Sequence, residues 1–126
     1  MKIKDINDIK GIKNNIILAT IIDTKGSVPR NINVSMAISD QEQHGTIGGG
    51  ELEFRVINES KKILFDSSIE KRILGYPLAR SLGPLCGGYV KIKLEKFING
   101  KTLIEKNNLN DEKNNINLYI FGAGHV

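Results

Sequence analysis

The sequence of 126 residues has no tryptophan, one cysteine, three prolines and few aromatic side chains. Because Cys86 stands alone, an internal disulfide framework and a cysteine-rich zinc site are excluded. No apolar run reaches the roughly 18 residues that span a bilayer, and the N-terminus lacks the apolar segment of a signal peptide. We therefore expect a cytoplasmic protein with no membrane partner.

Basic residues are spread along the chain and are not concentrated in one segment. The net charge is +4, but no dense Lys/Arg block alternates with aromatic residues, as it does in nucleic-acid-binding surfaces. Hydrophobic residues make up 40% and charged residues 25%, which is typical of a folded globular domain. We expect no nucleic-acid partner.

The first half of the chain predicts strands. Residues 16–22 form a continuous β-branched run, which indicates a central strand buried on both faces. Residues 34–39 alternate between larger apolar and smaller side chains, and a polar turn at residues 40–43 leads into residues 44–47. This pattern predicts a β-hairpin.

The second half predicts one main helix and two more strands. Residues 51–65 have apolar side chains at helical spacing directly after three glycines, and strands are expected over residues 71–74 and 89–95. The order of these elements indicates an α+β fold, in which a mixed β-sheet is accompanied by an amphipathic helix that follows a glycine-rich corner.

The composition changes toward the C-terminus. Residues 107–117 are mostly polar and predict a solvated linker after an N-terminal domain over residues 1–106. Residues 118–126 then predict a strand followed by Gly-x-Gly, which is how a dinucleotide-binding βαβ unit opens. The third glycine, the helix and the later acidic residue are missing, so we expect the first strand of a truncated Rossmann-like unit.

Three glycine clusters stand at the borders of the predicted elements, at residues 26–30, 45–51 and 82–88. Glycine loses more conformational entropy on folding than other residues, so such clusters indicate positive φ angles or a close approach of the backbone to a ligand or to another backbone segment. The sequence therefore predicts a site built largely from backbone.

The second cluster is a candidate anion site. Gly48, Gly49 and Gly50 open the predicted helix, whose first N–H groups lack partners within the helix. Glu51 and Glu53 add negative charge to the same turn, where they complement the helix dipole and would repel a phosphate. A tight corner between strand and helix is the alternative interpretation.

The other two clusters carry reactive side chains. Arg30 follows a proline in a rigid turn and could offer a bidentate fork to phosphate or carboxylate, with Ser27 adding a hydroxyl, or both could serve only the turn. Cys86 lies beside Gly87 and Gly88, whose amides would favour a thiolate that acts as a nucleophile, sulfur carrier or soft-metal ligand. A small buried hydrophobic residue is the alternative for Cys86.

Taken in order, the motifs at residues 26–30, 45–53, 82–90 and 121–126 resemble the XdhC/CoxI family of xanthine dehydrogenase accessory proteins. The resemblance implies a maturation factor, not an enzyme, that binds the molybdenum cofactor (molybdopterin) transiently. Its implied partners are apo xanthine dehydrogenase or a related molybdenum hydroxylase, and a cysteine desulfurase that supports sulfuration of the cofactor. Family members continue into a Rossmann-like domain at a strand like the one predicted over residues 118–126.

The resemblance also implies a binding site for this cofactor, with Cys86 as metal ligand. Backbone N–H groups, an arginine and a thiolate suit an anionic pterin phosphate that carries soft sulfur ligands and a metal. The chain departs from the family pattern at residues 33–36, where a lysine is missing, and at residues 84–89, where a thiol, an amide and a cation are missing. The implied cofactor-binding residues are Ser27, Arg30, Gly48, Gly49, Gly50, Cys86, Gly87 and Gly88.

Three other functions are compatible with the same residues. The chain could be a docking module for the hydroxylase or desulfurase that does not bind cofactor, or an enzyme or redox sensor that uses Cys86. It could also be half of a split dinucleotide-binding protein, completed by a separate chain. A homodimer is compatible with each of these functions.

Overall fold

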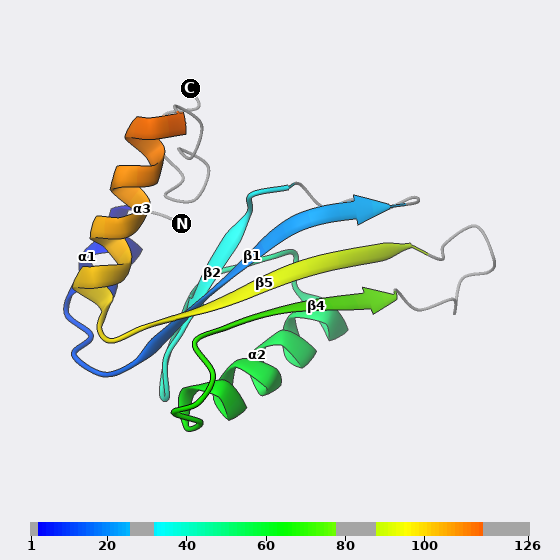
Figure 1. Ribbon diagram of the computed structural model, residues 1–126, viewed down its shortest axis with the longest axis horizontal. Coiled ribbons are helices and arrows are strands. Elements are labelled where there is room, and N and C mark those ends of the chain that lie inside the picture. The colour runs from blue at the N-terminus through cyan, green and yellow to red at the C-terminus, as the bar shows by residue number, and fades with distance from the viewer. Residues whose placement is uncertain (1–2, 26–31, 78–87, 115–126) are drawn as a thin grey trace.

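A computed structural model describes residues 3–25, 32–77 and 88–114. Within these ranges the chain forms a five-stranded antiparallel sheet with helices on both faces (Figure 1). The elements in chain order are α1 (Ile3–Lys10), β1 (Ile16–Lys25), β2 (Ser35–Ile38), β3 (Gln43–Gly45), α2 (Gly50–Leu64), β4 (Lys71–Pro77), β5 (Tyr89–Phe97) and α3 (Gly100–Asn114). The predicted α+β fold is confirmed, but all the described strand pairs are antiparallel, so the sheet is not the mixed sheet that was expected.

The strand order is β3-β2-β1-β5-β4, which places β1 at the centre. The side chains from Ile16 to Ile21 are all buried, because neighbouring strands flank β1 and helices cover parts of both faces. The predicted central strand is therefore confirmed. The predicted hairpin is also confirmed, since β2 pairs antiparallel with β3.

Helix α2 covers one face of the sheet and packs against β1, β2 and β5. It presents Leu52, Val56 and Ile63 to the sheet, which confirms the amphipathic helix expected from the sequence. The sheet contributes every second residue of its strands to this core: Ile17, Ala19, Ile21, Met36, Ile38, Val90, Ile92 and Leu94.

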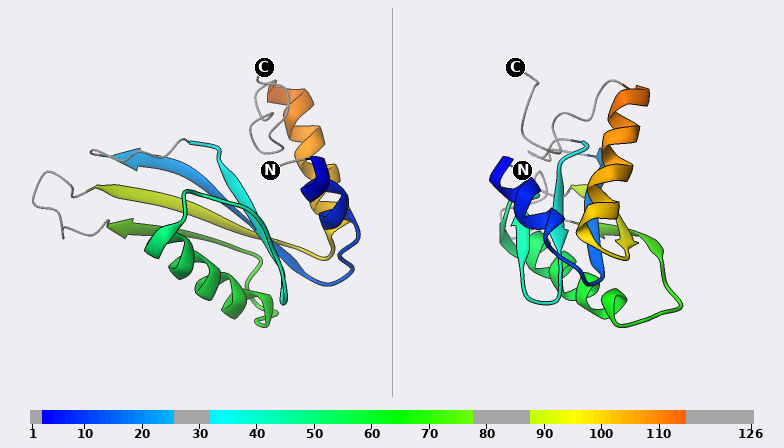
Figure 2. Two further views of the ribbon diagram at one scale, coloured as in Figure 1. Left: turned by 180° about the vertical axis from the view of Figure 1, so that it is seen from behind. Right: turned by 90° about the vertical axis from the view of Figure 1, so that its left-hand side faces the viewer.

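Helices α1 and α3 lie side by side on the opposite face, at one end of the sheet (Figure 2). Ile9, Leu103 and Ile104 from these helices form a second core. Their partners in the sheet are Ile16, Leu18, Ala37 and Phe97. The molecule therefore has three layers at this end. No helix within the described residues is long and apolar enough to cross a membrane.

Helix α3 continues to Asn114, so most of the predicted linker segment is helical. Leu103 and Ile104 anchor the first half of the helix, and propagation from a packed turn requires no apolar side chains in the second half. The polar composition of residues 107–114 therefore did not indicate their backbone structure. The predicted domain boundary at residues 106 and 107 stays a prediction.

Lys96 joins β5 to the end of α2, because its Nζ donates hydrogen bonds to the carbonyl oxygens of Ile63 (3.0 Å) and Asp66 (2.8 Å). Both carbonyl oxygens also accept a backbone N–H, from Asp66 and Ile69 respectively, and the ammonium group of Lys96 adds a charge-assisted bond to each. We expect Lys96→Met to lower the free energy of unfolding by about 1 kcal/mol in urea titrations. The control Lys62→Met removes an exposed ion pair with Glu59 and should cost less than about 0.5 kcal/mol. Equal losses in the two variants would contradict this capping role.

Candidate functional site

The segments that flank the predicted site residues meet at one end of the sheet. In the strand register, Tyr89 pairs with Lys25 on one side and with Pro77 on the other. The end of β1, the end of β4 and the start of β5 are therefore neighbours. The first turn of α2 lies toward the same end of the sheet, as Figure 1 and the left view of Figure 2 show.

The structure describes half of the predicted site residues. Gly48, Gly49 and Gly50 form the corner before α2, and Gly88 lies half-buried directly before β5. The other four, Ser27, Arg30, Cys86 and Gly87, lie outside the described residues. Their convergence on one surface therefore stays a prediction.

The glycine corner has a backbone that favours glycine at three successive positions. The φ angles are 121° at Gly48, 76° at Gly49 and 72° at Gly50. A Cβ atom added to Gly49 or Gly50 would meet no atom within 4 Å, so the backbone conformation, and not lack of space, requires glycine there.

The carboxylate of Glu53 occupies the inner side of this corner. Its Oε1 accepts hydrogen bonds from the backbone N–H groups of Ile47 and Gly49, both at 3.1 Å, and from the hydroxyl of Thr46 at 2.5 Å. The Thr46 hydroxyl oxygen in turn accepts the N–H of Gly48 at 3.0 Å. The backbone N–H groups of Gly48 and Gly49, which the sequence analysis considered as anion-binding groups, therefore already donate hydrogen bonds to side chains of this chain.

The hydrogen bonds also set the charge of Glu53. Partial burial raises its pKa, but the bonds from Thr46, Ile47, Gly49 and Gln43 together outweigh burial and hold the pKa below its usual value. The carboxylate is therefore ionised at neutral pH. An incoming phosphate would have to displace it, so these contacts favour the interpretation of a tight strand-to-helix corner.

Two further polar side chains near the corner, Glu51 and His44, have local partners. Glu51 lies 3.2 Å from the guanidinium of Arg55, one helical turn away, which is consistent with a surface and helix-dipole role. His44 is buried in β3, and its Nε2 lies 3.5 Å from the Glu42 carboxylate. Within the described ranges, no group of three or more His, Cys, Asp or Glu side chains could hold a metal ion.

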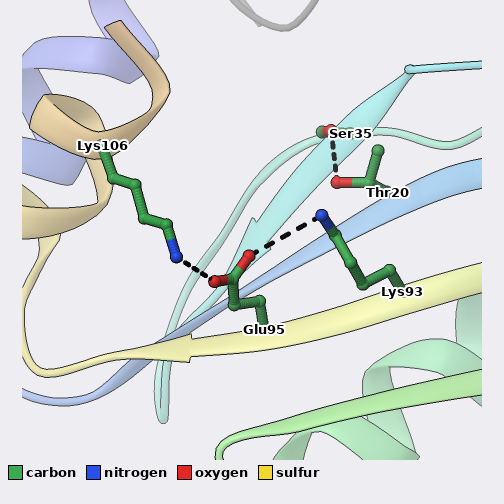
Figure 3. A network of polar contacts seen from close by, with 5 residues as sticks. All are labelled: Thr20, Ser35, Lys93, Glu95 and Lys106. Atoms are coloured by element: carbon green, nitrogen blue, oxygen red, sulfur yellow. Dashed lines mark hydrogen bonds and ion pairs between the residues drawn. The ribbon is translucent and has the colours of Figure 1, made fainter. Parts of the chain in front are cut away.

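A polar cluster on the sheet face opposite α2 was not predicted (Figure 3). Glu95, whose side chain is only 13% exposed, pairs with Lys106 of α3 and lies 3.8 Å from Lys93. Beside it, the hydroxyls of Thr20 and Ser35 share a buried hydrogen bond of 2.9 Å. The alternating polar positions of residues 89–95 were the available signal, but the sequence did not indicate that α3 covers them. The cluster attaches α3 to the sheet.

Two hollows lie at the other end of the sheet from Lys25 and Tyr89. Their volumes are about 360 and 330 Å³. The larger is lined by Lys13, Asn14, Asn15, Asp40, Leu64, Phe65 and Ile98, and the smaller by residues 11–14 and 39–42. Neither hollow contains a residue of the three glycine clusters.

Comparisons with known proteins show where this chain is similar to others. The family model described as "XdhC and CoxI family" matches residues 13–74. The chain is 31% identical over 113 residues to the "Uncharacterized protein YqeB" of Escherichia coli (strain K12), and this alignment covers 86% of the chain and 18% of that protein.

A solved structure shares the fold. It is the crystal structure of a xanthine dehydrogenase from Bacillus halodurans, with a TM-score of 0.59 and 24% identity over 74% of this chain and 29% of that one. The chain thus spans less than a third of the length of either relative. The family match includes the first glycine cluster and the complete glycine corner, and the described fold agrees with the solved structure. This chain belongs to the XdhC and CoxI family.

Proposed function

We propose that this chain takes part in the maturation of xanthine dehydrogenase or a related molybdenum hydroxylase. In this proposal it binds the molybdenum cofactor transiently and delivers it to the apo-hydroxylase, while a cysteine desulfurase supports sulfuration. The chain acts in the cytoplasm as an accessory factor and catalyses no turnover of its own. Family membership supports the maturation role, and the arrangement of the strand ends supports a binding site.

The observation that carries the proposal is the pairing of Lys25, Tyr89 and Pro77 across three neighbouring strands. It brings together the chain ends from which residues 26–31 and 78–87 continue, and the first turn of α2 lies toward the same end. Loops that leave one end of a rigid sheet are a common place for binding residues, because the sheet holds their ends in register.

The described residues fit such a ligand in shape better than in charge. Gly49 and Gly50 carry no side chain that would hinder a close backbone approach, and the positive end of the α2 dipole lies there. The amides of Gly48 and Gly49 are engaged, so we assign recognition of the negative charge to Arg30 and contact with the metal to Cys86. Ser27, Gly87 and Gly88 complete the proposed site.

The proposal predicts that the chain carries molybdenum when it is purified from cells that make the cofactor. We expect Cys86→Ser to lower the bound molybdenum by at least about tenfold, because a hydroxyl is a poor ligand for a soft metal centre. The measurement is molybdenum per chain by elemental analysis, followed by reactivation of an apo-hydroxylase. Ser68→Ala, near the start of β4 and remote from Tyr89, is the control and should leave both values unchanged.

The same experiment separates the docking module from the cofactor carrier. The engaged amides at the glycine corner favour the docking module, in which the chain binds hydroxylase or desulfurase without cofactor. A chain free of molybdenum that still co-purifies with apo-hydroxylase would establish that function and reject cofactor delivery. Molybdenum content that is unchanged in Cys86→Ser would remove the thiol from the proposed site.

A further inference from the structure

Helices cover only part of the sheet face opposite α2. Helices α1 and α3 pack on it at one end, where Leu18 and Phe97 belong to the core that these helices share with the sheet (Figure 2). Along the rest of β5 and β4, no described helix lies over this face (Figure 1). This uncovered part, the open face, consists of Lys71, Ile73, Gly75, Tyr89, Lys91 and Lys93.

Positive charge predominates on the open face. Lys71 and Lys91 form no ion pair with any described residue, and Lys93 lies 3.8 Å from the carboxylate of Glu95. Glu95 also pairs with Lys106 of α3, so two ammonium groups share one carboxylate that is only 13% exposed. The uncompensated charge of this surface therefore belongs to lysine.

Strand β1 adds one charge of each sign beside the open face. Asp23 is half-buried and lies opposite Lys91 in the strand register. Lys25, two residues later on the same side of the sheet, is exposed and lies opposite Tyr89. These two charges cancel, so the excess of lysine on β4 and β5 remains.

The outward surface of α2 shows a different arrangement of charge. There Arg55 lies 3.2 Å from Glu51, and Lys62 lies 3.7 Å from Glu59. Pairs of opposite sign within one helical turn are typical of a helix surface that only faces water. The open face lacks such mixing, so its charge is of the kind that attracts a partner of opposite sign.

An apolar strip lies between the lysines. Ile73 is 56% exposed and Tyr89 is 36% exposed. The ring of Tyr89 covers Gly75, since a Cβ atom added to Gly75 would lie 1.7 Å from the Tyr89 hydroxyl oxygen. In the register Ile73 lies opposite Lys93, and Gly75 lies opposite Lys91. An apolar centre that contains an aromatic ring, with charged groups around it, is the usual composition of a protein interface.

We infer that the open face docks an acidic surface of a protein partner, and that this partner is the apo-hydroxylase of the proposed function. The inference rests on that function and names the surface through which the two proteins meet. Lysine ammonium groups attract the carboxylates of the partner, while Ile73 and Tyr89 contact apolar side chains at the centre.

The open face suits a protein better than a small anion or a nucleic acid. Its cations are lysines, which are point charges without the bidentate fork with which arginine binds a single phosphate. Neither of the two hollows described above contains a residue of the open face. Tyr89 is its only aromatic residue, whereas surfaces that bind single strands stack several bases on aromatic rings.

The open face begins at the end of the sheet that carries the proposed binding site. Tyr89 belongs to both, because it is a residue of the open face and pairs with Lys25 and Pro77 at the strand ends. A partner docked on the open face would therefore lie next to the loops that continue from these ends. Such a position suits direct transfer of a ligand from this chain to the partner.

Binding of the complete chain to purified apo-hydroxylase, measured by surface plasmon resonance at low and at high salt, tests this surface. The double variant Lys71→Gln, Lys91→Gln should raise the dissociation constant at least about fivefold at low salt. The difference should shrink at high salt, because exposed charges are then screened. The control Lys61→Gln, Lys62→Gln on α2 changes the net charge equally and should leave the dissociation constant within about twofold of wild type.

The outcomes distinguish this inference from the proposed function. A wild-type chain that binds no apo-hydroxylase would reject the maturation role and the docking surface with it. Wild-type binding together with equal dissociation constants for the two double variants would reject the open face and leave the maturation role standing.

Lysine acetylation of the wild-type chain decides the case in which circular dichroism shows that a variant is unfolded. Acetylation of Lys71 and Lys91, followed by mass spectrometry, should slow at least about fivefold when apo-hydroxylase is added, while Lys61 and Lys62 keep their rates. Unchanged rates at Lys71 and Lys91 would reject the open face. Slow acetylation of these two lysines in the free chain would show that a second copy or another segment of this chain covers the face, and it would also reject the inference.

Discussion

Replacing Gly100 with alanine should lower the free energy of unfolding by about 3 kcal/mol, at the upper end of the cost of overpacking. A Cβ atom at Gly100 would lie 1.6 Å from the carbonyl oxygen of Ile9 and 2.6 Å from its carbonyl carbon. Both atoms belong to the backbone at the end of α1, so no side-chain rotation relieves the clash. The N–H of Gly100 also donates to the carbonyl of Ile12 at 2.8 Å, which holds the two segments together.

Urea unfolding followed by circular dichroism measures this loss, and Gly11→Ala is the matched control. A Cβ atom at Gly11 would meet the nearest atom, the carbonyl oxygen of Asp8, at an ordinary contact distance of 3.5 Å. We expect Gly11→Ala to change stability by no more than about 0.5 kcal/mol. Similar values for the two variants would show that α1 shifts away from α3 at little cost.

The second large effect is expected at Glu53. Glu53→Ala removes an ionised acceptor from the N–H groups of Ile47 and Gly49 and from the hydroxyl of Thr46. Hydrogen bonds to charged groups are stronger than neutral ones, so we expect a loss of about 2 kcal/mol at neutral pH. Glu51→Ala is the control, because it removes a negative charge from the same turn but breaks only an exposed pair with Arg55.

The contribution of Glu53 should depend on pH in a defined direction. Its pKa is lower in the folded chain than its usual value, so the folded state binds the proton less tightly than the unfolded state. The stabilisation is complete above the usual carboxyl pKa and is lost as the pH falls through the folded pKa. Urea titrations should show the difference between wild type and Glu53→Ala narrowing in acid. A difference that grows in acid would contradict the assigned role.

Much of the fold was predictable because its signals are local. The β-branched run at residues 16–22 predicted the central strand β1, and the helical spacing of Leu52, Val56 and Ile63 predicted α2. The glycines at positions 48, 49 and 50 predicted an unusual backbone, and all three have positive φ. Each of these signals arises from steric limits or periodicity within a few residues.

The candidate site was less predictable because its contacts join separate segments. The sequence placed Glu53 in the first turn of α2 and predicted that it would complement the helix dipole. It did not show that the carboxylate folds back to bind the amides of Ile47 and Gly49. Likewise, the polar spacing around Glu95 was visible, but its pairing with Lys106 depends on how α3 docks.

By itself, the sequence determined the main strands, the amphipathic helix, the glycine corner and the family, because these depend on local periodicity and on the order of short motifs. Only the tertiary structure decided that α1 and α3 form a second layer, that Lys25, Pro77 and Tyr89 are neighbours, and that Glu53 fills the corner. Strand register and helix docking minimise the free energy of the whole chain, and no short segment specifies them alone.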